Sequence, residues 1–498
     1  MTYKLMVIDD DMDRKALYQA VLSGADFEPI YVWTRRELQK QRDMPVDGYL
    51  LDVFLQRGDW RGATAADLLE EVVQLAPRPA PVFFISQRWD DPHVLSVLKQ
   101  AGKSSAKVIQ YLAWSEFEQA VQPDAAAASR LSALRTKLLS ELMLWHGRSS
   151  FRPEPDETIR ILLLADPQFG DEHTSQNALF TENWIAKKLR LDAQNGTPVP
   201  DLIVIAGDVT HSGRPDQFGL AEERLTHDLM APLWGEDSIE LRRDRIVVVP
   251  GNHDVNLRFS AADGRIFSPK EKEFRPDSPI MKSDDHAPYL SHQPYALEPF
   301  RRFAHRITRQ REWQDRSSMS WVDRRFIHCG IRFFVLNTVE DLDANRPTQA
   351  CFNERTMRLI NRSLADDNPD SIFSIAVSHH GLRPEGSMQE TEVENWVGVG
   401  RHFFSQHKIR LWLYGHYHAF HRRNITGSPF EDTPLWMVQA PTTRIYPSTR
   451  GFCVIELKRK AGHVIDAYVH NYVLDENGTT TRRPALRIYG GGDAPSLR

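Results

Sequence analysis

Side chains of metal-ligand type follow several apolar stretches of the sequence, at the points where strands are expected to end. The stretches and the polar residues after them are 159–165 with Asp166 and Gln168, 202–206 with Asp208, 246–249 with Asn252, 372–377 with His379, and 409–414 with His416 and His418. Ligands of open α/β sheets bind beyond the carboxyl ends of strands, so these turns can converge on one site.

This set offers two carboxylates, two amide oxygens and three imidazoles, enough to bind two divalent cations that share one carboxylate. Mixed oxygen and nitrogen donors without a thiolate suit Mn, Fe, Zn or Co. Two cations about 3.5–4 Å apart can hold a phosphoryl group, lower the pKa of a bridging water and stabilise the charge on the phosphoryl oxygens. A single Gly-Asp turn or a single histidine commonly has only a structural role. Five such turns in one chain are not expected by coincidence. The pattern therefore predicts phosphoester hydrolysis.

An N-terminal domain is predicted over residues 1–122, where short apolar runs alternate with amphipathic helical stretches. The expected strands are 4–9, 27–33, 48–55, 81–86 and 107–113, and the expected helices are 14–22, 34–42, 64–75 and 92–100. Parallel strands need crossover connections of this length, which are usually helices. The alternation is typical of an α/β domain with a doubly wound parallel sheet.

The spacing of apolar residues and the positions of prolines and charges divide the rest of the chain into a connector and a second domain. Residues 123–157 are predicted as a connector, because leucines recur at helical spacing over 124–147 and prolines with charges mark a boundary at 152–156. The apolar stripe is short for a dimerising coiled coil, so a packed helix is expected. The second domain is predicted over 158–475, with an insertion near the site at 255–325 and a mobile tail at 476–498.

Composition narrows the class of protein. The chain has 498 residues with 62 Lys+Arg and 67 Asp+Glu, a net charge of −5, and 41% hydrophobic residues, which is ordinary globular composition without a basic field for nucleic acid. The three cysteines contain no CxxC pair, so a disulfide framework is not expected. Acids follow the apolar run Leu5–Ile8, and no run is long enough to span a membrane, so no signal peptide and no membrane partner are expected. We expect a cytoplasmic protein.

The ordered motif set of the second domain resembles the calcineurin-like metallophosphoesterase superfamily over about residues 158–474. The motifs are Asp-x-Gln at 166–168, Gly-Asp at 207–208, Gly-Asn-His-Asp at 251–254, His379, and Gly-His-x-His at 415–418. The resemblance implies an α/β/β/α sandwich of two sheets.

The same resemblance implies roles for the motif residues. One metal would be bound by Asp166, Gln168, Asp208 and His418, and the other by Asp208, Asn252, His379 and His416. Asp208 would bridge the two metals. His253 would contact the phosphoryl oxygen or protonate the leaving alkoxide, and Asp254 would orient His253.

Two positions in these motifs depart from the usual pattern or leave a choice. The first motif usually ends in histidine, whereas this chain has Gln168, as in branches resembling manganese-dependent ADP-ribose/CDP-alcohol diphosphatases. Its neutral, hard amide oxygen favours Mn²⁺. The fourth motif offers both His379 and His380 as the ligand. In the family pattern the ligand is followed by x-Pro, and His380-Gly381 stands in that place here, which aligns His379 as the ligand.

Side chains that could contact substrate lie near these motifs. His211, in the loop after Asp208, can reach a substrate or serve as an ordinary loop residue. Arg214, Arg258 and Arg383 could clamp a second phosphate, although solvated surface arginines are the simpler interpretation.

The N-terminal domain resembles the receiver domain of bacterial response regulators, a flavodoxin-like fold. Asp9 and Asp10 end the first expected strand, Asp52 the third and Ser86 the fourth. By the resemblance, Asp52 is the candidate phosphoacceptor, the acids are a candidate Mg²⁺ site, and a histidine kinase is a candidate partner. The usual Lys-Pro after the fifth strand is replaced by 112–113, and Lys107 could substitute only if the strand shifted. A phosphorylated switch and a docking module without phosphotransfer both remain open.

These observations favour a two-metal hydrolase of a phosphodiester or diphosphate in a nucleotide-like small molecule, governed by the N-terminal domain. Three alternatives stay open: a nuclease on DNA or RNA, a phosphomonoesterase, and a non-catalytic signalling adaptor with a structural metal site. The retention of His253 and Asp254 argues against the adaptor, because a structural site needs neither. The oligomeric state is open.

Overall fold

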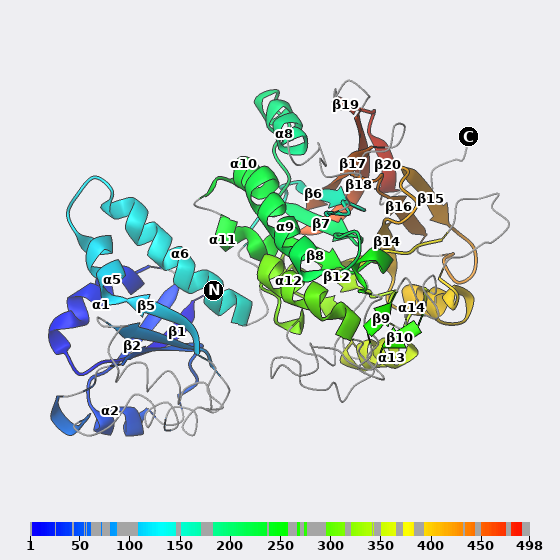
Figure 1. The fold of residues 1–498 in the computed structure, drawn as a ribbon. Helices are drawn as coiled ribbons and strands as arrows, with labels where there is room; N and C mark the ends of the chain where they lie inside the picture. Colours follow the sequence, from blue (N-terminus) through cyan, green and yellow to red (C-terminus); the bar gives the residue numbers. More distant parts are fainter. Residues whose placement is uncertain are drawn as a thin grey trace. The chain divides into compact units, whose positions relative to one another are not determined.

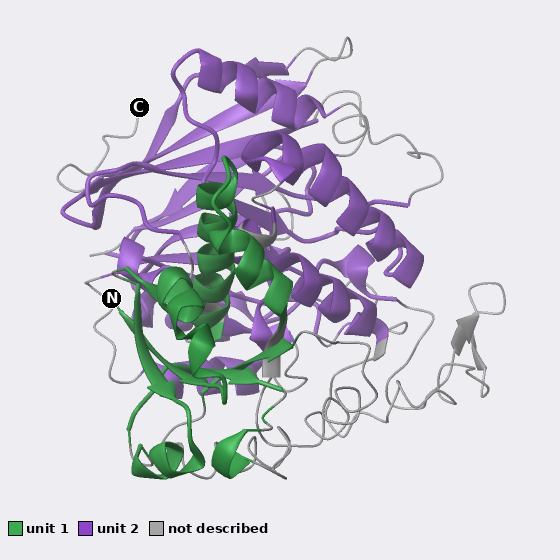
Figure 2. Ribbon diagram, turned by 90° about the vertical axis from the view of Figure 1, so that its left-hand side faces the viewer, with its two compact units in different colours: residues 1–150 green, residues 151–498 purple. Residues whose placement is uncertain are grey.

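The computed structural model divides the chain into two compact units, unit 1 (Met1–Ser150) and unit 2 (Phe151–Arg498), which Figure 2 shows in different colours. The structure describes residues 2–24, 26–41, 44–53, 55, 57–60, 71, 80–86, 108–145, 151–170, 183–236, 239–256, 266–268, 273–275, 295–313, 320–340, 342, 350–364, 372–382, 393–431, 434–443, 450–474 and 480–490. Among these residues no helix has the length and apolar character that crossing a bilayer requires.

Unit 1 contains one parallel sheet of five strands. The strands are β1 (Tyr3–Ile8), β2 (Phe27–Val32), β3 (Gly48–Asp52), β4 (Val82–Ser86) and β5 (Val108–Ala113), in the order β2-β1-β3-β4-β5. This is the flavodoxin-like order of a doubly wound sheet, and it confirms the predicted fold class. The described helices are α1 (Lys15–Leu22), α2 (Arg35–Lys40), α5 (Trp114–Val121) and α6 (Ala127–Trp145). The helices predicted at 64–75 and 92–100 fall almost wholly outside the described residues.

The helix predicted as a connector is α6, and it packs within unit 1. Leu134, Leu138 and Leu142 are buried in the same apolar cluster as Leu5 and Leu50 of the sheet. Their spacing of four residues puts all three side chains on one face of the helix. The helix is therefore part of the core of unit 1, which the leucine spacing alone could not show.

Unit 2 contains two mixed sheets. Sheet 1 has the order β19-β18-β17-β6-β7-β8, with β20 also paired to β18, and sheet 2 has the order β11-β12-β13-β14-β16-β15. The strands of sheet 1 are β6 (Ile159–Leu164), β7 (Leu202–Ala206), β8 (Ile246–Val249), β17 (Gly451–Lys460), β18 (His463–Leu474), β19 (Thr480–Arg482) and β20 (Leu486–Gly490). The strands of sheet 2 are β11 (Trp321–Asp323), β12 (Ile331–Val335), β13 (Phe373–Val377), β14 (Ile409–Tyr414), β15 (His421–Ile425) and β16 (Leu435–Gln439).

The two sheets share one apolar core, and helices cover their other faces. Leu163 and Val248 of sheet 1 are buried in the same cluster as Val335 and Leu413 of sheet 2. The helices beside sheet 1 are α8 (Trp184–Gln194), α9 (Pro215–Arg224), α10 (Ala231–Trp234), α11 (Ile239–Arg242) and α12 (Glu298–Thr308), and those beside sheet 2 are α13 (Glu354–Ser363) and α14 (Arg401–Gln406) (Figure 1). This is the predicted α/β/β/α sandwich.

Two segments differ from their predicted character. The expected mobile tail contains β19 and β20, both paired with β18, and Ile488 of β20 is fully buried. The expected insertion contains α12, whose Phe300, Phe303 and Ile307 are buried in the unit 2 core. These apolar residues lie three and four positions apart, a helical period that the many charged residues around them masked. A short hairpin, β9 (Ile266–Ser268) with β10 (Glu273–Arg275), also lies in this region.

Candidate metal centre

The seven predicted ligands lie in turns at the carboxyl ends of five strands. Asp166 and Gln168 follow β6, Asp208 follows β7, Asn252 follows β8, His379 follows β13, and His416 and His418 follow β14. Strands β6, β7 and β8 are parallel neighbours in sheet 1, and β13 and β14 are parallel neighbours in sheet 2. The turns of each sheet therefore meet at one edge, as the sequence pattern predicted.

Hydrogen bonds join the two sheets at this edge. The Asp166 Oδ2 atom of sheet 1 accepts the backbone N–H of His416 from sheet 2 at 3.1 Å. The Nδ1 atom of His379 lies 2.8 Å from the carbonyl oxygen of Ala206, at the end of β7. This contact places a proton on Nδ1, so Nε2 is the ring nitrogen that faces the other ligands.

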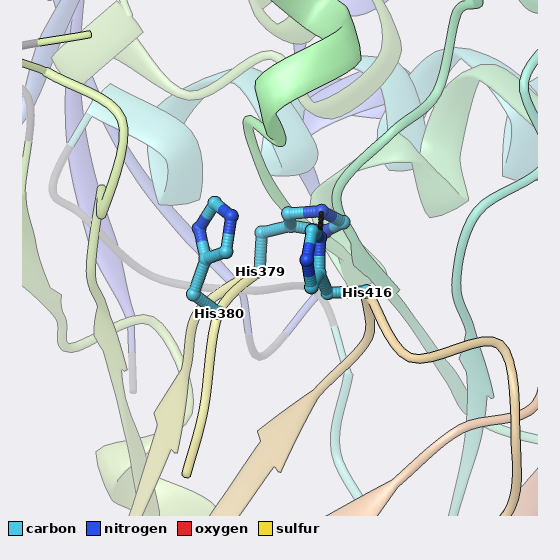
Figure 3. A group of neighbouring side chains, drawn as sticks. All are labelled: His379, His380 and His416. Atoms are coloured by element: carbon cyan, nitrogen blue, oxygen red, sulfur yellow. Dashed lines mark hydrogen bonds between the residues drawn. The ribbon is translucent and has the colours of Figure 1, made fainter. Parts of the chain in front are cut away.

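Three ligand atoms form a close triangle beyond strands β8, β13 and β14. The His379 Nε2 atom lies 3.0 Å from Asn252 Oδ1 and 3.1 Å from His416 Nδ1, and the last two atoms are 3.1 Å apart. Figure 3 shows His379, His380 and His416 as one cluster, in which the His416 ring centroid lies 5.1 Å from that of His379 and 4.5 Å from that of His380. An amide oxygen and two imidazole nitrogens at this spacing can hold a divalent cation.

The Asp208 carboxylate connects this triangle to the remaining ligands. Its Oδ1 atom lies 3.4 Å from His379 Nε2, and its Oδ2 atom lies 3.3 Å from Gln168 Nε2. On the far side, His418 Nε2 is 3.5 Å from Asp166 Oδ1. Asp208 thus lies between two groups of donors, the position expected of a ligand shared by two cations.

The backbone at these turns is held in an unusual conformation. Five of the seven predicted ligands have left-handed φ angles: Asp166 (52°), Gln168 (44°), Asp208 (51°), His416 (75°) and His418 (58°). Such a residue costs about 1–3 kcal/mol and persists only where the surrounding structure imposes it, often at a functional site. Glycines allow the close approach, because a Cβ on Gly251 would lie 2.2 Å from Asp208 Oδ1.

The electrostatics of the site favour positive charge. Burial lowers the pKa of His379, but the Asp208 carboxylate outweighs this and raises that pKa to about 10. Burial also raises the pKa of Asp208, but His379 and His253 outweigh it, so the pKa falls well below the usual range. Asp166 is fully buried, and its Oδ1 atom accepts no hydrogen bond from the residues that the structure describes. A buried carboxylate oxygen without a donor among these residues, converging donor atoms and strained turns fit a pair of divalent cations.

His253 and Asp254 differ from the expected arrangement. The Nδ1 atom of His253 lies 2.7 Å from the carbonyl oxygen of His211, which orients the imidazole. The described contacts of the Asp254 carboxylate go instead to the backbone N–H groups of Val209, Thr210 and Gly251, at 3.1, 2.8 and 3.0 Å. Asp254 therefore fixes the Gly-Asp turn against the Gly-Asn-His-Asp turn, and the described contact of the His253 ring is with the backbone of His211.

The remaining candidates of unit 2 divide into three groups. His211 lies beside His253, with ring centroids 5.5 Å apart. His380 contacts Thr338 Oγ1 through Nδ1 at 2.9 Å, and its ring centroid is 4.5 Å from that of His416. Arg214 pairs with Asp216 at 2.8 Å, while Arg258 and Arg383 fall outside the described residues.

Sequence reasoning overlooked two threonines at this site. The Thr210 hydroxyl donates to Asp254 Oδ1 at 3.1 Å, and the Thr442 hydroxyl donates to the carbonyl oxygen of Asp166 at 2.9 Å. Thr442 follows β16 and so links sheet 2 to the first ligand turn. A lone threonine carries no sequence signal for such a long-range contact, although its place after a strand end would have been a reason to consider it.

In unit 1 the predicted acids do come together. Ligand atoms of Asp9, Asp10 and Asp52 lie within 4.8 Å of one another, and Ser86 is buried at the end of β4. Lys107 falls outside the described residues.

Solved structures that resemble the chain fall into two groups. Over unit 2, a dimetal phosphatase from Danio rerio has 12% identity and a TM-score of 0.40, with 68% of this chain and 99% of that chain covered. A purple acid phosphatase from yellow lupin has 13% identity, a TM-score of 0.38, and 70% and 58% coverage. NtrX from Brucella abortus has 18% identity, a TM-score of 0.20, and 36% and 41% coverage.

Comparison with curated proteins gives no match. The family model described as calcineurin-like phosphoesterase matches residues 159–420, which is more than half of the chain and includes all seven predicted ligands. Membership of this family implies metal-dependent phosphoester hydrolysis at a dinuclear divalent-metal site. The chain belongs to the calcineurin-like phosphoesterase family.

Proposed function

We propose that the protein hydrolyses a phosphodiester or diphosphate bond in a nucleotide-like small molecule. The observation that carries this proposal is the convergence of seven oxygen and nitrogen donors from five strand-end turns of two sheets on one buried edge. Gln168 supports the diphosphate class, because the resembling diphosphatase branches carry the same substitution in their first motif.

In this proposal Asp166, Gln168, Asp208 and His418 hold one cation. Asp208, Asn252, His379 and His416 hold the other. His379 rather than His380 is assigned as ligand, because its Nε2 atom contacts Asn252 and lies 3.4 Å from Asp208. The amide oxygens of Gln168 and Asn252 are hard, neutral donors, which favours manganese over softer metals. When bound, the two cations would polarise the phosphoryl group and lower the pKa of an attacking water.

The chain itself supplies proton transfer and orientation. The Nδ1–H group of His253 donates to the His211 carbonyl oxygen, which leaves Nε2 to meet the substrate. His253 then protonates the departing alkoxide or contacts a phosphoryl oxygen. The half-buried His211 side chain lies beside it and is placed to contact the rest of the substrate.

Unit 1 is proposed to govern this hydrolase as a receiver-like module. Its support is the β2-β1-β3-β4-β5 order and the group of acids at the carboxyl ends of β1 and β3. A cytoplasmic location is proposed because the sequence has three widely spaced cysteines without a CxxC pair, and burial favours the thiol form of Cys329 by raising its pKa to about 12.

The test compares hydrolysis of bis-p-nitrophenyl phosphate and p-nitrophenyl phosphate with Mn²⁺ and with chelator. Asp208→Asn keeps the shape of the side chain but removes the shared charge, so kcat/KM should fall about 10³-fold, equivalent to about 4 kcal/mol of transition-state stabilisation. Asp216→Asn, an exposed change on α9, is the matched control.

The outcomes discriminate between the open alternatives. Faster turnover of the diester supports the proposal, and faster turnover of the monoester indicates a phosphomonoesterase. Activity on nucleic acid that falls steeply with salt indicates a nuclease. Full activity of Asp208→Asn, or activity unaffected by chelator, contradicts the two-metal site.

A further inference from the structure

The acidic pocket of unit 1, which consists of Asp9, Asp10 and Asp52, already contains a cation. Arg14 follows β1 in a short 3-10 turn, and its guanidinium donates to Asp52 Oδ2 and lies 3.5 Å from Asp9 Oδ2. The Asp9 and Asp52 side chains are 0% and 2% exposed and the Arg14 side chain is 23% exposed, so the two carboxylates are buried and their partner is partly buried. One guanidinium thus bridges the ends of β1 and β3.

Aromatic rings hold Arg14 in this place. Its Cζ atom lies 4.2 Å from the centroid of the buried Trp114 ring, a cation–π contact. Tyr18 packs against Trp114 at a centroid distance of 5.3 Å and donates its hydroxyl to Asp9 Oδ2 at 2.8 Å. Burial lowers the pKa of Arg14, but Asp52 and Asp9 outweigh this and raise it, so the side chain stays charged.

Two further carboxylate oxygens of the pocket also accept hydrogen bonds. Asp9 Oδ1 accepts the backbone N–H of Asp11 at 2.8 Å, and Asp10 Oδ2 accepts that of Arg57 at 2.5 Å. Magnesium requires near-octahedral oxygen ligands and binds through one or two carboxylates. Each of the three acids here already has a donor, so the pocket does not fit the Mg²⁺ that the receiver resemblance implies.

The residues at the end of the fifth strand also depart from the receiver pattern. A receiver places a lysine after this strand to pair with the phosphoryl group, whereas β5 here ends at Ala113 and is followed by Trp114. The ring that lies against Arg14 therefore belongs to the residue that directly follows the two positions of the expected Lys-Pro pair. Arg14, which lies over the Trp114 ring, donates to Asp52, the residue beside which both cations of a receiver are expected.

We propose that Arg14 is the permanent counter-ion of this pocket, so that unit 1 neither binds Mg²⁺ at Asp52 nor accepts a phosphoryl group there. Asp52 then has a structural role. The proposal concerns unit 1 alone and does not depend on the hydrolytic activity of unit 2.

The first experiment measures thermal stability of the full chain with and without about 10 mM Mg²⁺. Wild type and Asp52→Asn should respond equally, since any response comes from unit 2. Arg14→Ala leaves two buried carboxylates without a counter-ion and opens the pocket, so Mg²⁺ should stabilise it further. A site at tenfold excess over its Kd shifts the melting temperature of a domain of this size by about 4 °C.

The matched controls are Arg35→Ala and Arg14→Lys. Arg35 pairs with Glu71 at 3.0 Å on the surface of the same unit, so its removal should leave the Mg²⁺ response at the wild-type value. Arg14→Lys keeps the positive charge and should also stay insensitive to Mg²⁺ at unit 1. An equal Mg²⁺ response of Arg14→Ala and wild type overturns the proposal.

The second experiment exposes the wild-type chain to acetyl phosphate and Mg²⁺ and records the intact mass. No adduct is expected. An acyl phosphate that disappears in Asp52→Asn overturns the proposal, as does a wild-type Mg²⁺ response that is lost in Asp52→Asn. Both readings compare wild type with Asp52→Asn, so they stand even if Arg14→Ala does not fold.

Discussion

Gly251→Ala should displace the shared carboxylate while changing only one methyl group. Gly251 lies between β8 and the ligand Asn252, with an extended backbone that alanine also adopts. An added Cβ would lie 2.2 Å from Asp208 Oδ1 and 2.4 Å from the Asp208 backbone nitrogen. Ordinary van der Waals contact begins near 3.4 Å, so the Asp208 turn must move by about 1 Å.

The size of the effect follows from that displacement. Overpacking of a rigid interior costs about 1–3 kcal/mol. A misplacement of about 1 Å in a catalytic arrangement lowers the rate about 10²-fold, and disturbance of the support around a metal ligand lowers affinity about 10–100-fold. We therefore expect kcat/KM for the diester to fall about 10²-fold and the Mn²⁺ midpoint to rise at least tenfold.

The assay titrates Mn²⁺ against diester hydrolysis and measures urea unfolding of the same preparations. Gly219→Ala is the matched control, because Gly219 lies in α9 and a Cβ there meets nothing within 4 Å. It should keep wild-type kinetics and gain up to about 1 kcal/mol in stability. If Gly251→Ala keeps both its Mn²⁺ midpoint and its kcat/KM within threefold of wild type, the close approach of the two turns does not position Asp208.

Two further predictions concern the frame of unit 2. Burial raises the pKa of Asp201 to about 6, above its unfolded value, so the stability that its protonated form contributes is present below about pH 4 and is lost as the pH rises through 6. Asp201→Asn should therefore match wild type near pH 4 and be more stable by about 3 kcal/mol at pH 8 in urea unfolding, and equal stability at pH 8 would contradict this. Phe300→Ala should cost about 3–5 kcal/mol by the same method, because α12 packs into the core, and a loss below 1 kcal/mol would show that the helix is peripheral.

The parts of the site that could be predicted from sequence share a local cause. Each ligand lies within four residues of the end of an apolar strand. Its place in the sequence therefore predicts that it lies at the edge of the sheet where that strand ends. Asp208 after β7 and Asn252 after β8 illustrate this, since their strands are adjacent and parallel. The same reasoning identified the acids at the ends of β1 and β3 in unit 1.

The parts that could not be predicted depend on contacts between distant residues. Arg14 pairs with Asp52, which lies 38 positions away, and nothing in its own sequence context distinguishes it from a solvated arginine. Asp254 was expected to contact its neighbour His253, but it accepts hydrogen bonds from Val209 and Thr210, more than 40 positions away. In each case the partner depends on which turns the sheets bring together. The order of residues in a single sequence does not show which distant turns become neighbours.

The strained turns and the chemistry of unit 2 have one origin. A ligand that follows immediately after a buried strand must turn its side chain back over the sheet edge, and at five positions the chain does so with a left-handed backbone. Glycine would adopt that conformation without strain, yet it offers no ligand atom. The left-handed backbone therefore lowers local stability at Asp166, Asp208 and His418, but it keeps a donor atom at the sheet edge. The shared core of the two sheets has to hold these turns in place, and that is why the cross-sheet contact from Asp166 to His416 is as much a part of the metal centre as the ligands themselves.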